Sequence, residues 1–80
     1  MNRIEKEKCI EMMIEGICSG KFAEEAFKKS TEEEKNKDFT SAKISELKGQ
    51  NALGYAEGIN QVLVSIGFKH PQMEELSKLI

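Results

Sequence analysis

The fold is decided by residues 40–66, which read TSAKISELKGQNALGYAEGINQVLVSI. Projected at about 100° per residue, the apolar side chains of this stretch gather on one side of a helix. They are Ile44, Ala52, Leu53, Tyr55, Ala56, Ile59, Val62, Leu63, Val64 and Ile66. Their arc of about 200° is twice the apolar stripe of an ordinary surface helix. We therefore expect a helix over 40–66, about 40 Å long, that contacts more than one neighbour.

The residues before this stretch predict two shorter helices. Within 4–18, apolar side chains recur at helical spacing, and Ser19-Gly20 provides a stop because glycine readily takes the left-handed conformation after a last turn. A second short helix is expected over 21–29. The apolar positions of these two helices are Ile10, Met13, Ile14 and Ile17, and then Phe22, Ala23, Ala26 and Phe27.

Residues 30–38 contain no apolar side chain and fit two interpretations. Thr31 and Glu34 have the spacing of a capping box, which would start a helix here. Alternatively, 30–39 is an exposed connection, and Asp38 or Thr40 caps the next helix. We favour an exposed connection that contains some helical turn.

After residue 66 the pattern predicts a short tail helix over 71–79. Gly67 is a good helix stop, and proline in the pair His70-Pro71 favours the first turn of a new helix. The apolar side of the tail helix is formed by Met73, Leu76 and Leu79 or Ile80. With no alternating strand pattern, residues 1–80 predict one all-α domain. We expect a small helical bundle around one long C-terminal-half helix, with two shorter N-terminal helices and a short tail helix.

Composition narrows the classes of protein that the chain can represent. The 80 residues carry a formal net charge of −2, and no apolar run approaches the length of a membrane-spanning helix. The charged residues 1–8 lead into no long apolar stretch, so we expect no secretory signal. The two cysteines, Cys9 and Cys18, lie too far apart on one helix for a mutual disulfide. We therefore expect a cytoplasmic protein with reduced thiols and no membrane contact, and the charge balance disfavours a nucleic acid partner.

No set of residues predicts catalysis. His70 is the single histidine, stands beside the single proline, and is interpreted as a helix-boundary residue. The spacing of Cys9 and Cys18 is not that of a zinc site, and no nucleophile stands near a base in the sequence. We therefore expect no enzyme activity, no cofactor and no bound metal.

Glycines inside the long helix are its unusual feature. Gly49, Gly54 and Gly58 each cost roughly 1 kcal/mol relative to alanine. They allow three explanations: close packing against another helix of this chain or of a second copy, a ligand groove, or tolerated glycines in a helix that is kinked or broken near 49–54. The candidate interface or ligand strip is Gln50, Asn51, Gly54, Tyr55, Gly58 and Gln61.

These observations favour a non-catalytic interaction protein that acts by stoichiometric binding, as an adaptor, inhibitor or small regulator does. The short helices do not suffice to cover the wide apolar arc, so we expect a self-associating homo-oligomer, with a two-fold dimer as the default, and a protein partner. One alternative is a protein that sequesters a small polar ligand or nucleotide over Gln50–Gln61. A second is a helix-turn-helix DNA-binding regulator with its turn at 17–22, although the only arginine is Arg3.

Overall fold

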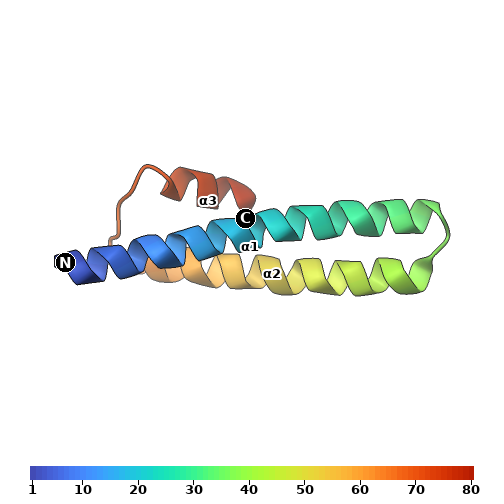
Figure 1. Cartoon of the computed structure of the whole chain (residues 1–80), viewed down its shortest axis with the longest axis horizontal. Helices are drawn as coiled ribbons and strands as arrows, with labels where there is room; N and C mark the ends of the chain where they lie inside the picture. Colours follow the sequence, from blue (N-terminus) through green and yellow to red (C-terminus); the bar gives the residue numbers. More distant parts are fainter.

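The computed structural model describes all residues, 1–80, and confirms the all-α prediction. It contains α1 (Arg3–Lys35), α2 (Phe39–Ser65) and α3 (Met73–Leu79). Helices α1 and α2 run antiparallel, side by side, and the short α3 folds back along α1 near the N-terminal end (Figure 1). The molecule is a rod with extents of 52 × 17 × 17 Å. None of the three helices combines the length and the apolar character needed to cross a membrane.

Helix α2 confirms the predicted long helix almost to the residue. The Asp38 carboxylate accepts a hydrogen bond from the Ser41 N–H, so Asp38, one of the two expected caps, begins the helix. At the other end, Gly67 adopts a φ of +76° and Phe68 N–H donates to the Leu63 carbonyl. This is the glycine-terminated cap expected at a helix C-terminus. The helix runs through its three glycines without a break, so the alternative of a helix broken near 49–54 is wrong.

The prediction of two short N-terminal helices is wrong, because α1 is continuous from Arg3 to Lys35. Ser19 and Gly20 lie within it. The Ser19 hydroxyl donates to the Ala52 carbonyl of α2 at 2.7 Å. Gly20 is buried, and a Cβ at this position would lie 2.8 Å from Cβ of Leu79. Gly20 therefore allows α3 to approach α1 closely and does not terminate a helix.

The expected connection over 30–39 is much shorter in the structure. Residues 30–35 belong to α1, and only Asn36–Asp38 form the turn between the two long helices. Thr31 does not cap a helix, since its hydroxyl donates to the Phe27 carbonyl one turn earlier. Glutamates 32–34 and Lys35 are good helix formers, and Glu33 accepts a 2.6 Å hydrogen bond from the Ser45 hydroxyl of α2. These interactions extend α1 to Lys35.

The seam between α1 and α2 repeats every seven residues. Its buried positions are Cys9, Gly16, Ala23 and Ser30 in α1, and Ala42, Gly49, Ala56 and Leu63 in α2. This spacing keeps one face of each helix on the other over their whole length. Toward the turn the seam consists of small residues, so a serine reaches across it: the Ser30 hydroxyl donates to the Ala42 carbonyl at 2.8 Å. The two backbones therefore approach closely in this half of the rod.

Large side chains are buried only in the half that α3 covers. Met13, Leu63 and Leu76 are the largest fully buried side chains. Phe68 packs into the same cluster from the connection between α2 and α3. The predicted tail helix begins at Met73, two residues later than expected, and an ion pair of 3.1 Å between Lys21 and Glu75 ties it to α1. A seven-residue helix thus closes the core at one end of the rod.

Candidate functional site: the open side of the hairpin

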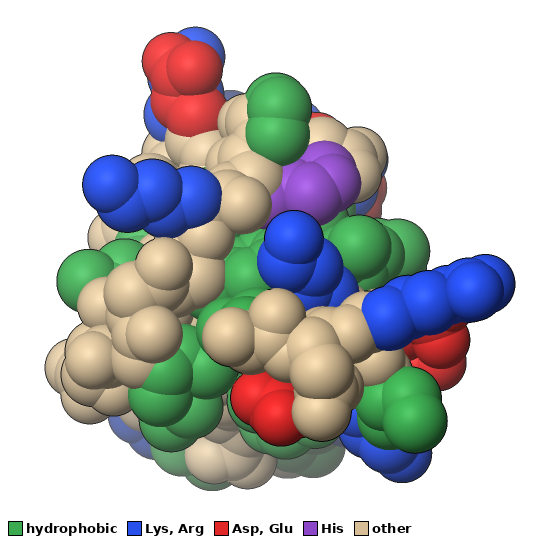
Figure 2. All heavy atoms as spheres, turned by 90° about the vertical axis from the view of Figure 1, so that its left-hand side faces the viewer, with side chains coloured by type: hydrophobic (Ala, Val, Ile, Leu, Met, Phe, Trp, Pro, Cys, Tyr) green, Lys and Arg blue, Asp and Glu red, His purple; other side chains and the backbone are tan.

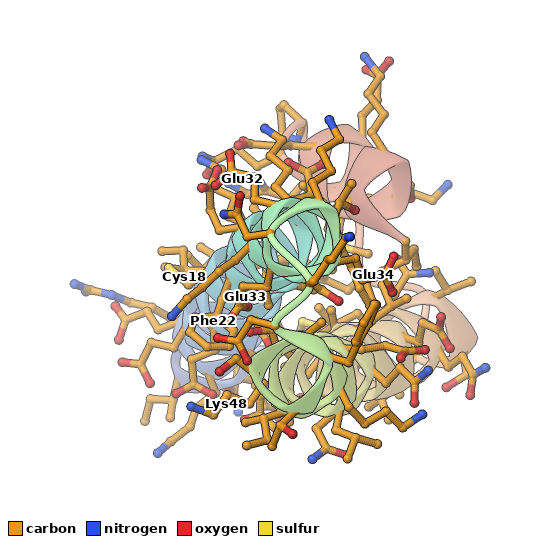
Figure 3. The ribbon with its side chains drawn as sticks, turned by 90° about the vertical axis from the view of Figure 1, so that its right-hand side faces the viewer. Cys18, Phe22, Glu32, Glu33, Glu34 and Lys48 are labelled. Atoms are coloured by element: carbon orange, nitrogen blue, oxygen red, sulfur yellow. The ribbon has the colours of Figure 1, made fainter.

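Helix α3 covers one side of the α1–α2 pair and leaves the opposite side uncovered. Seen along the rod from the turn, α3 lies to the right of the two long helices, and Cys18 and Phe22 lie to the left (Figure 3). We call the surface away from α3 the open side. It is lined by Met12, Glu15 and Phe22 of α1 and by Lys48, Tyr55, Gly58 and Val62 of α2.

Helix α1 contributes one continuous strip to the open side. Met12, Glu15, Ser19 and Phe22 follow one another at spacings of three or four residues, which places them on one face of a helix. Ser19 at the edge of this strip is bonded to α2, whereas Phe22 projects outward with 55% of its surface exposed. Of the two phenylalanines in this part of α1, only Phe27 packs against the facing helix, at Gly49.

Helix α2 contributes a hollow of about 380 Å³ to the same side. Its lining comes from both long helices: Met12, Gly54, Tyr55, Gly58, Ile59 and Val62. A Cβ built at Gly54 or Gly58 would meet no atom within 4 Å. Packing of these two glycines against another helix of the same chain is therefore wrong, and the missing side chains instead leave a depression in the surface.

The structure gathers only part of the predicted strip. All six residues are exposed, but of these only Gly54, Tyr55 and Gly58 line the hollow. Gln50 instead donates to the Glu46 carboxylate on its own helix, at 3.3 Å. The remaining lining residues are apolar, so the hollow lacks the amide groups that a polar ligand over Gln50–Gln61 was expected to use.

Tyr55 links the two long helices on the open side through its phenol group. Its phenol donates to a Glu15 carboxylate oxygen at 3.0 Å, across the two helices. This hydrogen bond and the negative charge of Glu15 raise the pKa of Tyr55 above its usual value of 10.0. The contact fixes the ring beside the hollow while its face stays accessible.

Five residues of the open side were not among the sequence candidates: Met12, Glu15, Phe22, Lys48 and Val62. Val62 was placed in the apolar arc, but not at a site. Met12 and Phe22 fall on different predicted helices when α1 is divided at Gly20, so their common strip is hidden. If α1 is taken as one continuous helix, the strip becomes visible, because residues 12, 15, 19 and 22 then lie on one face of it.

The remaining sequence candidates lie elsewhere. Cys9 is buried and Cys18 is exposed, both on α1 and both free. No group of three or more His, Cys, Asp or Glu side chains is placed to hold a metal ion. His70 lies in the α2–α3 connection and accepts a hydrogen bond from the Gln72 N–H through Nδ1. The turn at 17–22 required by the helix-turn-helix alternative is absent, since α1 is continuous there.

Asn60 has a buried Oδ1 atom with no hydrogen-bond partner. In comparisons with known proteins, no family model, no curated protein and no solved structure matches this chain.

Proposed function

We propose that this protein is a non-catalytic interaction protein that binds stoichiometrically through its open side, and that a second copy of the chain occupies this side. The observation that carries the proposal is the uncovered apolar surface opposite α3. Tyr55 and Val62 remain about half exposed there, and Phe22 projects from the same side farther along the rod. Covering these side chains would release roughly 25 cal/mol for each Å² of apolar surface removed from water.

The shape of the open side supports a second copy as the occupant. It carries a projection at Phe22 and a hollow at Met12 and Gly58. Along α1, Phe22 and Met12 are separated by about 15 Å. A two-fold axis across the rod halfway between them would set each Phe22 over the hollow of the other copy. Symmetric dimers of this kind require such a self-complementary surface.

Charge also supports this arrangement. Under the same two-fold relation, Lys8 would lie near Glu25 of the second copy, and Glu5 near Lys29. These pairs at the rim would favour the antiparallel register over alternatives, although each contributes little affinity in water. A cytoplasmic location is part of the proposal, and the free thiols Cys9 and Cys18 are compatible with it. Action as an adaptor, inhibitor or small regulator would then depend on a partner that uses the same surface.

Sedimentation equilibrium tests the proposal with variants of exposed residues. Wild type is expected to dimerise at micromolar concentration. Phe22→Ser removes the projection and Gly58→Leu fills the hollow, so each is expected to weaken the dimer at least about tenfold, since 1.4 kcal/mol is tenfold. Phe39→Ser is the matched control, because Phe39 is 65% exposed at the start of α2, far from the hollow.

Three results would contradict the proposal: a wild-type monomer throughout the micromolar range, a dimer unaffected by Phe22→Ser and Gly58→Leu, or equal weakening by Phe39→Ser. Circular dichroism of each variant establishes that the helices are retained.

A further inference from the structure

A second hollow lies at the N-terminal end of the rod, between the beginning of α1 and the α2–α3 connection. It measures about 430 Å³ and is lined by Met1, Lys6, Ile10, Gly67, Phe68, Lys69 and His70. Figure 2 looks onto this end of the molecule and shows Lys or Arg side chains and the histidine beside hydrophobic atoms. None of these residues lines the open side, so this end hollow is a separate site.

The backbone after α2 builds one wall of the end hollow. Gly67 at φ +76° turns the chain, and Phe68 is thereby held in the core with only 8% of its surface exposed. The His70 ring stacks on Phe68, with centroids 6.1 Å apart and an interplanar angle of 13°. Because Nδ1 of His70 accepts from the Gln72 N–H, the ring carries its proton on Nε2 when neutral, and this group is left to donate.

The polar side chains that line the end hollow are all basic. Lys6, Lys69 and His70 line it, and no acidic side chain does. None of the ion pairs of the protein involves Lys6 or Lys69. The ammonium groups that approach from α1 and from the connection are therefore without an anionic partner.

We propose that the end hollow binds a small amphipathic carboxylate, such as a medium-chain fatty acid. Its apolar chain would lie against Ile10 and Phe68, and its carboxylate would accept charge-assisted hydrogen bonds from Lys6, Lys69 and Nε2–H of His70. A neutral apolar molecule would leave the ammonium groups without a counter-charge, and an inorganic anion would leave the apolar wall exposed to water. The lining therefore matches a ligand that combines an apolar chain with an anionic group. The volume lies in the range of small-molecule sites.

Titration of ¹⁵N-labelled protein with octanoate, and separately with 1-octanol, tests this inference. Octanoate is expected to cause saturable amide shifts at Gly67, Phe68 and Lys69, with much weaker binding of octanol. Lys6→Gln and Lys69→Gln should each weaken octanoate binding roughly two- to fivefold, the range measured for exposed ion pairs. Lys35→Gln is the matched control, because Lys35 is exposed at the opposite end of α1 and does not line the hollow.

Equal affinity for octanol would overturn the inference, since it would identify an apolar depression without a role for charge. Shifts confined to Tyr55 and Gly58, or no saturable shifts with octanoate, would also overturn it. Phe22→Ser separates this site from the proposed dimer, because it should weaken self-association and leave octanoate binding unchanged.

Discussion

The phenol of Tyr55 on α2 donates a 3.0 Å hydrogen bond to a carboxylate oxygen of Glu15 on α1. It is one of two hydrogen bonds that join a side chain of α1 to a side chain of α2, and the other links Ser45 to Glu33 near the turn. Through the bond to Glu15 the ring of Tyr55 is held at the edge of the hollow over Gly58. An exposed aromatic ring fixed in this way loses little conformational freedom when a partner covers it.

The first prediction concerns the titration of Tyr55. Because the hydrogen bond to Glu15 and its charge favour the neutral phenol, the pKa of Tyr55 should exceed 10.0, and Glu15→Gln should lower it toward that value. Tyr55 is the only tyrosine and tryptophan is absent, so phenolate absorbance reports this group alone. Since the pKa is raised on folding, the stabilisation by this contact is complete below pH 10 and is lost as pH rises through the folded-state value. Identical titration curves for wild type and Glu15→Gln would contradict the contact.

The second prediction compares the same substitution at two glycines of α2. A Cβ at Gly49 would lie 2.7 Å from the Phe27 ring, whereas one at Gly54 would meet nothing within 4 Å. Gly49→Ala should therefore destabilise the protein by about 1 to 3 kcal/mol through overpacking. Gly54→Ala should stabilise it by up to about 1 kcal/mol, because alanine is the better helix former. Urea denaturation measures the free energy of unfolding of each variant. An equal change in both variants would contradict the packing at Gly49.

The third prediction tests the small-residue half of the seam. Ala42 is 3% exposed and its carbonyl accepts from Ser30 on the facing helix. Ala42→Leu has no room there and should destabilise the protein by about 1 to 3 kcal/mol. Thr40→Leu, at an exposed position of the same helix, should change stability by less than about 0.5 kcal/mol. Thermal unfolding followed by circular dichroism distinguishes the two, and a tolerated Ala42→Leu would mean that the helices are not closely packed here.

The fourth prediction concerns the turn between the long helices. Lys37 adopts a φ of +60° directly after α1, and it is the only residue other than glycine with a positive φ. The left-handed conformation costs an L-residue roughly 1 kcal/mol, so Lys37→Gly should stabilise the protein by about 0.5 to 1 kcal/mol despite the added freedom of the unfolded chain. Lys35→Gly, in the last turn of α1, should destabilise it by about the same amount. Chemical denaturation measures both, and a destabilised Lys37→Gly would contradict the turn geometry.

The sequence predicts α2 well because its apolar period is long and its ends carry clear signals, Asp38 and Gly67. It does not predict the continuity of α1, because glycine after Ser19 has two physical uses. One is to end a helix in the left-handed conformation, and the other is to let a neighbouring element approach. Only the position of Leu79 in the fold shows that Gly20 serves the second use.

Only the α2 half of the candidate site was predictable from the sequence. Gly54, Tyr55 and Gly58 stand out because glycines are unusual within a helix. The opposing residues Met12 and Phe22 depend on the register between the two helices, which small residues such as Ala23 and Ala42 determine. Such residues contribute little to a hydrophobic pattern, and their importance becomes apparent only when the helices are side by side.

The repeat of the seam has a consequence for the evolution of this chain. Deleting seven residues from α1 and seven from the facing part of α2 would restore the same register and shorten each arm by about 10 Å. The turn-proximal arms, whose buried positions include Ser30 and Ala42, can therefore lengthen or shrink in paired steps while the α3-covered end stays unaltered. The distance between the turn and the termini can therefore change in steps of about 10 Å without a change in the packing at the α3-covered end.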